Sequence, residues 1–156
     1  VESLFLQLRD YLPEEWRRII GGRDSAFIKK IIELEKTRLA NLSEFRKNVE
    51  YFFERPVYSK DLLKYKPEQN LEDVGIHLDR LLNIFQDIST QNFTQEKIKS
   101  IVMPYAEEKG RGEVLWPLRV ALSGRKASPG PFEIAEILGK EKVIERLKEA
   151  AAIIKN

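Results

Sequence analysis

The chain has 156 residues, of which 42% are hydrophobic and 33% are charged, with a net charge of +2 and no cysteine. This composition is that of one folded domain or two small ones, and it excludes a disordered tail, a disulfide framework and a thiolate metal site. No apolar run is long enough to span a bilayer and no signal peptide opens the chain, so we expect no membrane contact and a cytoplasmic location. The chain begins at Val1 rather than at a methionine, so we expect the full protein to extend further N-terminally.

Hydrophobic periodicity predicts helices from the first residues onward. Up to residue 55 the expected helices cover residues 2–11, 13–20, 25–41 and a segment that begins at Ser43. The Gly21-Gly22 pair ends the second of these helices, and Asp24 or Ser25 can cap the third.

The predicted helix over residues 25–41 has the cleanest apolar face, and two charged residues interrupt it. One arc of this helix carries Phe27, Ile28, Ile31, Ile32, Leu34 and Leu39. Glu35 and Arg38 project into the same arc. They can form an (i, i+3) ion pair whose stems pack while the charged groups reach water. Alternatively, Arg38 lies among apolar neighbours in order to point at a ligand.

Residues 55–69, RPVYSKDLLKYKPEQ, carry two prolines and form the expected boundary between two helical subdomains, residues 1–55 and 56–156. Beyond the boundary, NLED at 70–73 is similar to a capping box, and Thr94 can cap a later helix. The expected helices there cover residues 70–88, a segment after Thr94, and residues 113–122, 131–138 and 140–155. Residues 109–112 are expected to form a basic, flexible turn. Because no convincing strand is found, we predict an all-α helical bundle of two small subdomains.

A search for catalytic or metal-binding groups is negative. The single histidine, His77, lies at the edge of an apolar arc and is expected to pack with one satisfied nitrogen. No cluster of histidine or cysteine could hold zinc, and no phosphate-binding loop, dinucleotide fingerprint or nucleophile elbow is present. We therefore expect no catalytic residue, no metal ligand and no bound cofactor within this chain.

The segment RVALSGRKASPGPF, residues 119–132, has a composition that a simple connector rarely needs. Gly124 and Gly130 allow positive φ and a close approach of another backbone. Pro129 and Pro131 stiffen the loop, so that binding would order little. Pro131 also suits the first turn of a helix whose early amides would attract an anion.

Positive charge and hydroxyl groups accumulate around this loop. Ser123 and Ser128 offer hydroxyls that can donate or accept. Between residues 109 and 126 a single acid, Glu113, is outnumbered by five cations: Lys109, Arg111, Arg119, Arg125 and Lys126. Such a loop suits single-stranded RNA, because cations neutralise phosphates and hydroxyls meet base edges. The alternative is an ordinary helix–helix connector with a basic surface.

Most aromatic side chains at helical spacing are expected to fill the core: Phe52, Phe53, Phe85, Trp116 and Phe132. For Trp116 we expect core packing rather than base stacking. Tyr58 and Tyr105 lie near predicted helix breaks and are expected to be exposed.

Two segments resemble a known family. Residues 112–147, GEVLWPLRVALSGRKASPGPFEIAEILGKEKVIERL, contain the patterns W-P-x-R-x-A-L-[ST]-G-x-x-x-[ST]-P-G-x-F-E and L-G-K-E-x-x-x-x-R-L. They resemble the C-terminal anticodon-binding region of bacterial-type glutamyl-tRNA synthetases. Residues 37–58, TRLANLSEFRKNVEYFFERPVY, are similar to the helical segment that precedes it in that family. The resemblance covers essentially the whole chain and implies the all-helical anticodon-binding unit of a class I synthetase, with a first subdomain that ends near residue 55.

Family roles carry over only where positions match. The resemblance implies that Arg38 reads the third anticodon base, which favours its ligand-facing interpretation, although Glu35 can still orient it. Pro131 departs from the family, since many relatives carry leucine there. Arg125 and Lys126 lie where relatives vary, so we assign them phosphate contacts. The predicted anticodon-binding residues are Arg38, Arg119, Ser123, Gly124, Arg125, Lys126, Ser128, Pro129 and Pro131.

The resemblance implies that the chain is the C-terminal part of a glutamate–tRNA ligase, which joins glutamate to its tRNA with ATP and magnesium. The HIGH-like and KMSKS-like motifs of the catalytic domain are absent from it. The expected partners are the tRNA-Glu anticodon stem-loop and the catalytic domain of the parent enzyme, and we expect a monomer. Two alternatives stay open: a helical protein-interaction adaptor, and the same domain of a non-discriminating synthetase that also charges tRNA-Gln.

Overall fold

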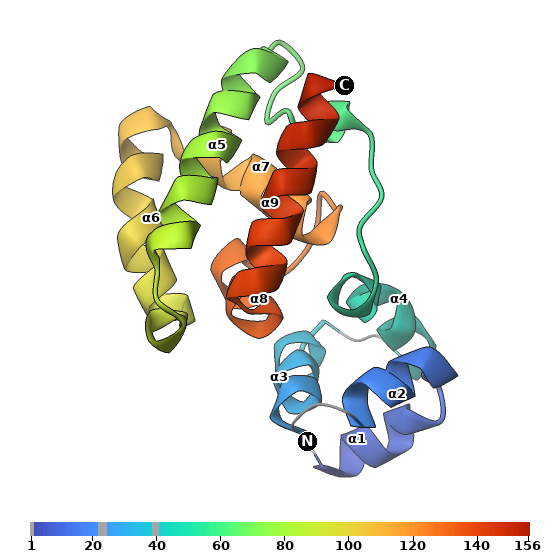
Figure 1. The fold of residues 1–156 in the computed structure, drawn as a ribbon. Helices are drawn as coiled ribbons and strands as arrows, with labels where there is room; N and C mark the ends of the chain where they lie inside the picture. The colour runs from blue at the N-terminus through green and yellow to red at the C-terminus, as the bar shows by residue number, and fades with distance from the viewer. Residues whose placement is uncertain (1, 22–24, 39–40) are drawn as a thin grey trace. The chain divides into compact units, whose positions relative to one another are not determined.

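The computed structural model describes residues 2–21, 25–38 and 41–156, and helices joined by short loops make up the fold (Figure 1). No strand forms among these residues, which confirms the all-α prediction. The chain divides into two compact units, Val1–Arg55 and Pro56–Asn156, each with its own buried core. None of the described helices is both long enough and apolar enough to cross a bilayer.

The first unit consists of α1 (Glu2–Arg9), α2 (Glu14–Gly21), α3 (Ser25–Glu35) and α4 (Leu42–Phe53). Its core gathers apolar side chains from all four helices and the α1–α2 turn, among them Leu8, Leu12, Trp16, Ile28, Ile31, Ile32, Phe45, Val49 and Phe52. The Trp16 ring stacks on Phe53 with centroids 4.6 Å apart, and its Nε1 donates to the Glu54 carboxylate at 3.1 Å. A stacked, hydrogen-bonded indole of this kind ties α2 to the end of α4.

Helix α3 is shorter than its hydrophobic pattern predicts. It ends at Glu35, and residues 36–38 form a turn in which the Arg38 N–H donates to the Glu35 carbonyl at 2.9 Å. Such i→i+3 bonds tighten the last turn of a helix and rotate the following side chains away from its apolar face. Glu35 is buried, as predicted, but Arg38 is exposed, so the prediction that Arg38 projects into the apolar arc is wrong.

Three further predictions concern this segment and the helix that follows it. The proposed cap Asp24 and the apolar position Leu39 lie outside the described residues. Helix α4 begins one residue before Ser43, because the Asn41 side chain accepts a hydrogen bond from the Glu44 N–H at 3.0 Å and caps the helix.

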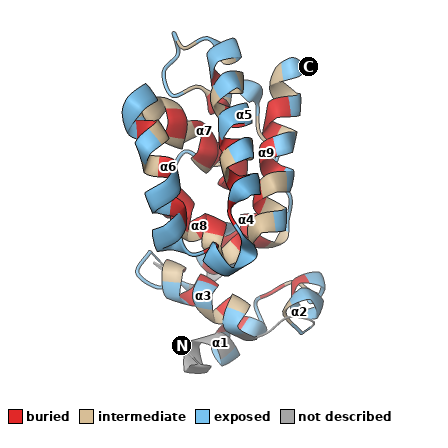
Figure 2. Cartoon of the chain, turned by 60° about the vertical axis from the view of Figure 1, so that its left-hand side comes forward, coloured by how far each residue is buried: buried red, intermediate tan, exposed pale blue. Residues whose placement is uncertain are grey.

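The second unit consists of η1 (Lys60–Leu63), α5 (Leu71–Asp87), η2 (Thr90–Asn92), α6 (Gln95–Lys109), α7 (Arg111–Ser123), α8 (Pro131–Leu138) and α9 (Lys140–Lys155). Helices α5 and α9 lie side by side (Figure 1). Helix α7 packs against α5, α6, α8 and α9, and its second half is almost entirely buried (Figure 2). The unit is therefore built around α7, and the loop that follows this helix starts from its buried second half.

The helix ends in this unit follow local capping chemistry. The Asn70 side chain accepts from the Glu72 N–H at 2.8 Å, and Thr94 Oγ1 accepts from the Lys97 N–H at 3.3 Å, which confirms both predicted caps. The predicted turn over residues 109–112 is only one residue long: α6 ends at Lys109 and α7 begins at Arg111. Gly110, with φ at 114°, makes this abrupt change of direction possible.

Most of the predicted core aromatics are buried, namely Phe52, Phe85 and Phe132, while Phe53 is half-buried. Trp116 is also only half-buried, so the prediction of a core position is wrong for this residue. Tyr58 and Tyr105 are half-buried rather than exposed. The reason for Tyr105 is a hydrogen bond of 2.7 Å between its hydroxyl and His77 Nδ1, which holds the ring against α5.

Candidate nucleic-acid interface

The loop between α7 and α8 begins with a left-handed glycine. Gly124 has φ 68° and ψ 18°, and its N–H donates to the Val120 carbonyl at 2.7 Å. A Cβ at this position would lie 2.8 Å from Cβ of Pro56 and 3.4 Å from Cδ1 of Tyr58. Backbone conformation and space both require glycine here, which confirms the predicted positive φ.

Gly130 behaves differently from Gly124. Its φ is −59° and its ψ 145°, and a Cβ would meet nothing closer than 3.7 Å. Gly130 therefore does not use the positive φ that glycine allows, because the following Pro131 favours extended backbone in the residue before it. Pro131 is the first residue of α8, as predicted, and both Pro129 and Pro131 are buried.

Arg119 holds the far side of the loop. Its Nη1 donates to the Ser128 carbonyl at 2.7 Å, the Ser128 hydroxyl at 2.8 Å and the Pro129 carbonyl at 2.9 Å. A charged donor bonded to three oxygens of one short segment restrains that segment strongly. The geometry therefore makes Arg119 a positioning residue for the Ser128-Pro129 pair.

The two loop serines are bonded within the loop itself. Ser123 is buried; its Oγ donates to the Arg119 carbonyl at 2.8 Å and accepts from the Arg125 N–H at 3.2 Å. The Ser128 Oγ lies 2.9 Å from the Pro129 carbonyl in addition to its contact with Arg119. Ser123 thus shapes the turn after α7, whereas the half-buried Ser128 keeps acceptor capacity at the surface.

The cations near the loop are fewer than the sequence predicts. Lys126 is exposed on the loop and Arg125 is half-buried beside it. Lys109 and Arg111 flank the other end of α7, which has 13 residues, and so lie roughly 20 Å away along the helix axis. They are paired with Glu108 at 3.6 Å and with Glu107 at 3.1 Å, respectively. Lys109 and Arg111 therefore do not add to the charge of the loop, because they lie at the opposite end of α7 and are paired with carboxylates there.

One arginine that holds the end of α7, where the loop begins, was not predicted. Arg146 of α9 is only 4% exposed, and its Nη1 donates to the Leu122 carbonyl at 2.6 Å. This carbonyl belongs to the last turn of α7, where carbonyls lack partners within the helix. The signal was available, since Arg146 is the arginine of the L-G-K-E-x-x-x-x-R-L pattern, but nothing local shows that it reaches α7.

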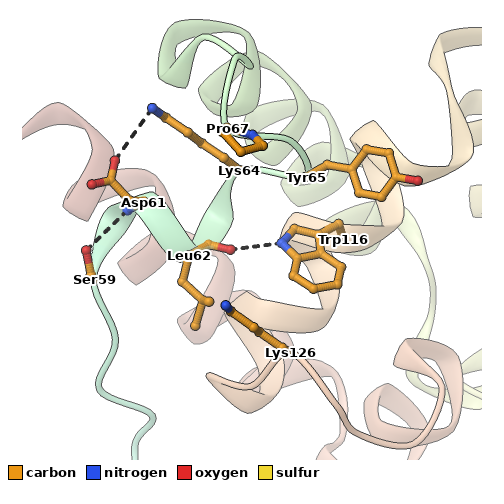
Figure 3. A pocket seen from close by; sticks show the side chains of 8 residues that line it. All are labelled: Ser59, Asp61, Leu62, Lys64, Tyr65, Pro67, Trp116 and Lys126. Atoms are coloured by element: carbon orange, nitrogen blue, oxygen red, sulfur yellow. Dashed lines mark hydrogen bonds and ion pairs between the residues drawn. The ribbon is translucent and has the colours of Figure 1, made fainter.

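A pocket of about 710 Å³ adjoins the loop (Figure 3). Its walls come from three places: Trp116 of α7, Lys126 of the loop, and the segment around η1, which contributes Ser59, Asp61, Leu62, Lys64, Tyr65 and Pro67. The Trp116 Nε1 donates to the Leu62 carbonyl at 2.9 Å, which explains why this indole stays at the surface of the core. No sequence pattern indicates this pocket, because its two parts lie about fifty residues apart in the chain.

Arg38, the remaining predicted site residue, belongs to the first unit, where it is exposed in the turn after α3. An exposed guanidinium on a short turn is available to a ligand of that unit. The other eight predicted residues all lie between Arg119 and Pro131 in the second unit.

His77 has the packing role expected for it. It bonds to the Tyr105 hydroxyl, and burial lowers the pKa of this histidine, while Asp73 and Glu113 oppose the shift. Among the described residues, no group of three or more histidine, cysteine, aspartate or glutamate side chains could hold a metal ion.

The fold is all-α, and its most buried helix leads into a hydrogen-bonded loop with two cations, an arrangement that suits single-stranded RNA. The chain belongs to the family described as the anticodon binding domain, whose model matches residues 3–151.

The curated relatives that the chain matches are glutamate–tRNA ligases. That of Clostridium tetani is 41% identical over 131 residues, covering 81% of this chain and 26% of the relative. That of Clostridium acetobutylicum is 35% identical over 130 residues, again covering 81% and 26%. The chain therefore spans about a quarter of the length of these relatives and corresponds to their C-terminal region.

Solved structures share the fold. A glutamate tRNA ligase from Elizabethkingia meningosepticum, crystallised in complex with its amino acid, matches with a TM-score of 0.72 at 24% identity over 97% of this chain and 30% of its own. The glutamate-tRNA synthetase of Elizabethkingia anophelis matches with a TM-score of 0.67 at 23% identity over the same shares.

Proposed function

We propose that this chain recognises the anticodon stem-loop of tRNA-Glu as the C-terminal part of a glutamate–tRNA ligase. The observation that carries this proposal is the match of residues 3–151 to the anticodon binding domain family. The names of the curated relatives support glutamate as the amino acid of the parent enzyme. That enzyme would use ATP and magnesium in a catalytic domain outside this chain and would act as a monomer in the cytoplasm.

The braced loop after α7 suits this role. Arg119 holds the Ser128-Pro129 end of the loop, and Arg146 holds the last turn of α7 from which the loop starts, so that little conformational entropy is lost when RNA binds. The Ser128-Pro129 segment faces the anticodon bases, and Arg125 and Lys126 neutralise the neighbouring phosphates. In this arrangement Ser123, Gly124 and Pro131 set the shape of the loop rather than touch bases.

In this proposal Arg38 contacts the third anticodon base and distinguishes it from other bases. Its exposure on a turn supports this assignment, because a guanidinium can donate two hydrogen bonds to one base edge. The anticodons for glutamate and glutamine differ at this third base, so Arg38 would separate tRNA-Glu from tRNA-Gln.

The test is a titration of the purified chain with two anticodon stem-loops that differ only in the third anticodon base, at two salt concentrations. Wild type should bind the glutamate stem-loop more tightly, and Arg38→Ala should lose about 1–3 kcal/mol of this preference. The matched control is Arg18→Ala in α2, whose guanidinium is paired with Glu14 at 2.9 Å and whose loss should leave the preference intact. Weak binding of both stem-loops by wild type, with no base preference, would instead favour the protein-interaction adaptor.

A further inference from the structure

The pocket beside the loop combines the groups that hold a single nucleotide. Its volume of about 710 Å³ falls within the range in which proteins bind small organic ligands. Two aromatic rings, Tyr65 and Trp116, lie next to each other in its wall with centroids 6.2 Å apart. Aromatic side chains at a surface offer stacking platforms to unpaired bases regardless of base identity.

Both rings are held in place before any ligand arrives. The Trp116 indole is anchored by its 2.9 Å bond to the Leu62 carbonyl. Tyr65 is 42% exposed, yet its ring lies directly over Gly112 of α7, where an added Cβ would collide with it. A platform that is already ordered costs little entropy when a base stacks on it.

The charges around the pocket suit one phosphate group. Figure 3 shows Lys64 turned toward Asp61, with which it forms an ion pair at 3.6 Å, whereas Lys126 extends into the pocket between Leu62 and Trp116. Lys126 is exposed and belongs to the loop between α7 and α8. The pocket is therefore continuous with the proposed RNA-binding loop and carries its own cation.

We infer that this pocket takes one unpaired nucleotide of the bound RNA next to the anticodon bases. The base of this nucleotide stacks on Tyr65 and Trp116, and its phosphate lies beside Lys126. This inference rests on the proposed function, because it assigns a second contact to the same RNA. Stacking contacts are sequence-tolerant, so the pocket contributes affinity and register rather than base discrimination.

Fluorine NMR of the chain labelled with 5-fluorotryptophan tests this inference directly. The chain has only two tryptophans, and Trp16 is buried in the first unit, where it serves as an internal reference. Addition of the glutamate stem-loop should shift the Trp116 resonance much more than that of Trp16. Stem-loops with an abasic nucleotide at each loop position in turn should identify one position whose loss abolishes the Trp116 shift.

Variants of Tyr65 test whether its ring contributes to the affinity for the stem-loop. Tyr65→Ala should weaken stem-loop binding by about 5- to 150-fold without changing the third-base preference, while Tyr65→Phe, which keeps the ring, should bind like wild type. Gly112→Ala should also weaken binding, because it displaces the ring without removing it. The control is Tyr11→Ala, which removes another exposed tyrosine, 56% exposed in the first unit, and should leave affinity unchanged.

The outcomes distinguish this inference from the proposed function. The pocket assignment would be overturned if the stem-loop does not shift the Trp116 resonance and Tyr65→Ala binds it as tightly as wild type does. If wild type still prefers one third anticodon base in that case, anticodon recognition remains supported. Binding of free uridine or adenosine monophosphate at Trp116, with no effect of the stem-loop, would also overturn it, because the pocket would then be a mononucleotide site. If no stem-loop is preferred over another, the proposed function itself fails.

Discussion

Gly124 and Gly130 provide the sharpest test of how the loop is built, because the same substitution should have opposite consequences six residues apart. At Gly124, alanine would have to adopt a φ of 68°, which costs an L-residue roughly 1–2 kcal/mol. Its Cβ would also lie 2.8 Å from Cβ of Pro56, and such overpacking costs about 1–3 kcal/mol. We therefore expect Gly124→Ala to destabilise the second unit by about 2–5 kcal/mol.

Gly130→Ala should be neutral or slightly stabilising. Its φ of −59° suits any residue, and the nearest atom to an added Cβ is 3.7 Å away, which is an ordinary contact. Alanine would restrict the unfolded chain, which stabilises a protein by about 0.4–1 kcal/mol. The stability of Gly124→Asn should lie between those of Gly124→Ala and Gly130→Ala. Asparagine tolerates the left-handed conformation, but its Cβ still collides with Pro56.

Thermal unfolding of the three variants measures these differences, with the fluorine signal of Trp116 as the reporter for the second unit. For a unit of this size, a loss of about 2–5 kcal/mol corresponds to a decrease in Tm of about 10–25 °C. Equal Tm values for Gly124→Ala and Gly130→Ala would refute the argument, since they would show that neither φ nor the contact with Pro56 constrains the loop.

Three further predictions concern charge and protonation. Lys126→Ala should reduce the slope of log K against log salt by about 0.7–1 without altering base preference, because one phosphate contact is lost. The control is Lys99→Ala, which removes an exposed lysine of α6 and should leave the slope unchanged. A slope for Lys126→Ala equal to that of wild type would argue against a phosphate contact. Arg146→Met should cost about 1–3 kcal/mol in urea unfolding because the Leu122 carbonyl loses its partner, and a neutral result would mean that this bond does not brace α7. Because burial lowers the pKa of His77 below 6.5, the folded state binds fewer protons than the unfolded state, so stability should fall as pH drops from 6.5 toward the folded pKa. His77→Gln should remove the part of this loss of stability that His77 causes, as measured by urea unfolding between pH 6.5 and lower pH. A variant with the same pH dependence as wild type would contradict this assignment to His77.

The sequence alone was sufficient wherever a local rule determines the structure. Asparagine and threonine bond to the first free amides of a helix from neighbouring positions, so the caps at Asn70 and Thr94 could be predicted. Glycine allows positive φ, so Gly124 and Gly130 could both be named as candidates for it, and Gly124 adopts it. The long composite pattern over residues 112–147 also led to the correct family, since a match of that length arises from a shared fold.

Only the tertiary structure decided what the individual site residues do. Periodicity predicted that Arg38 projects into the apolar arc of its helix, but α3 ends at Glu35, three residues before Arg38. A helix end depends on packing that no apolar pattern records. Arg146 braces α7 from a helix 24 residues away in the chain, and the pocket brings Tyr65 next to Trp116. Such contacts join segments that are distant in sequence, so they exist only once the helices have packed, and propensities that act over three or four residues cannot specify them.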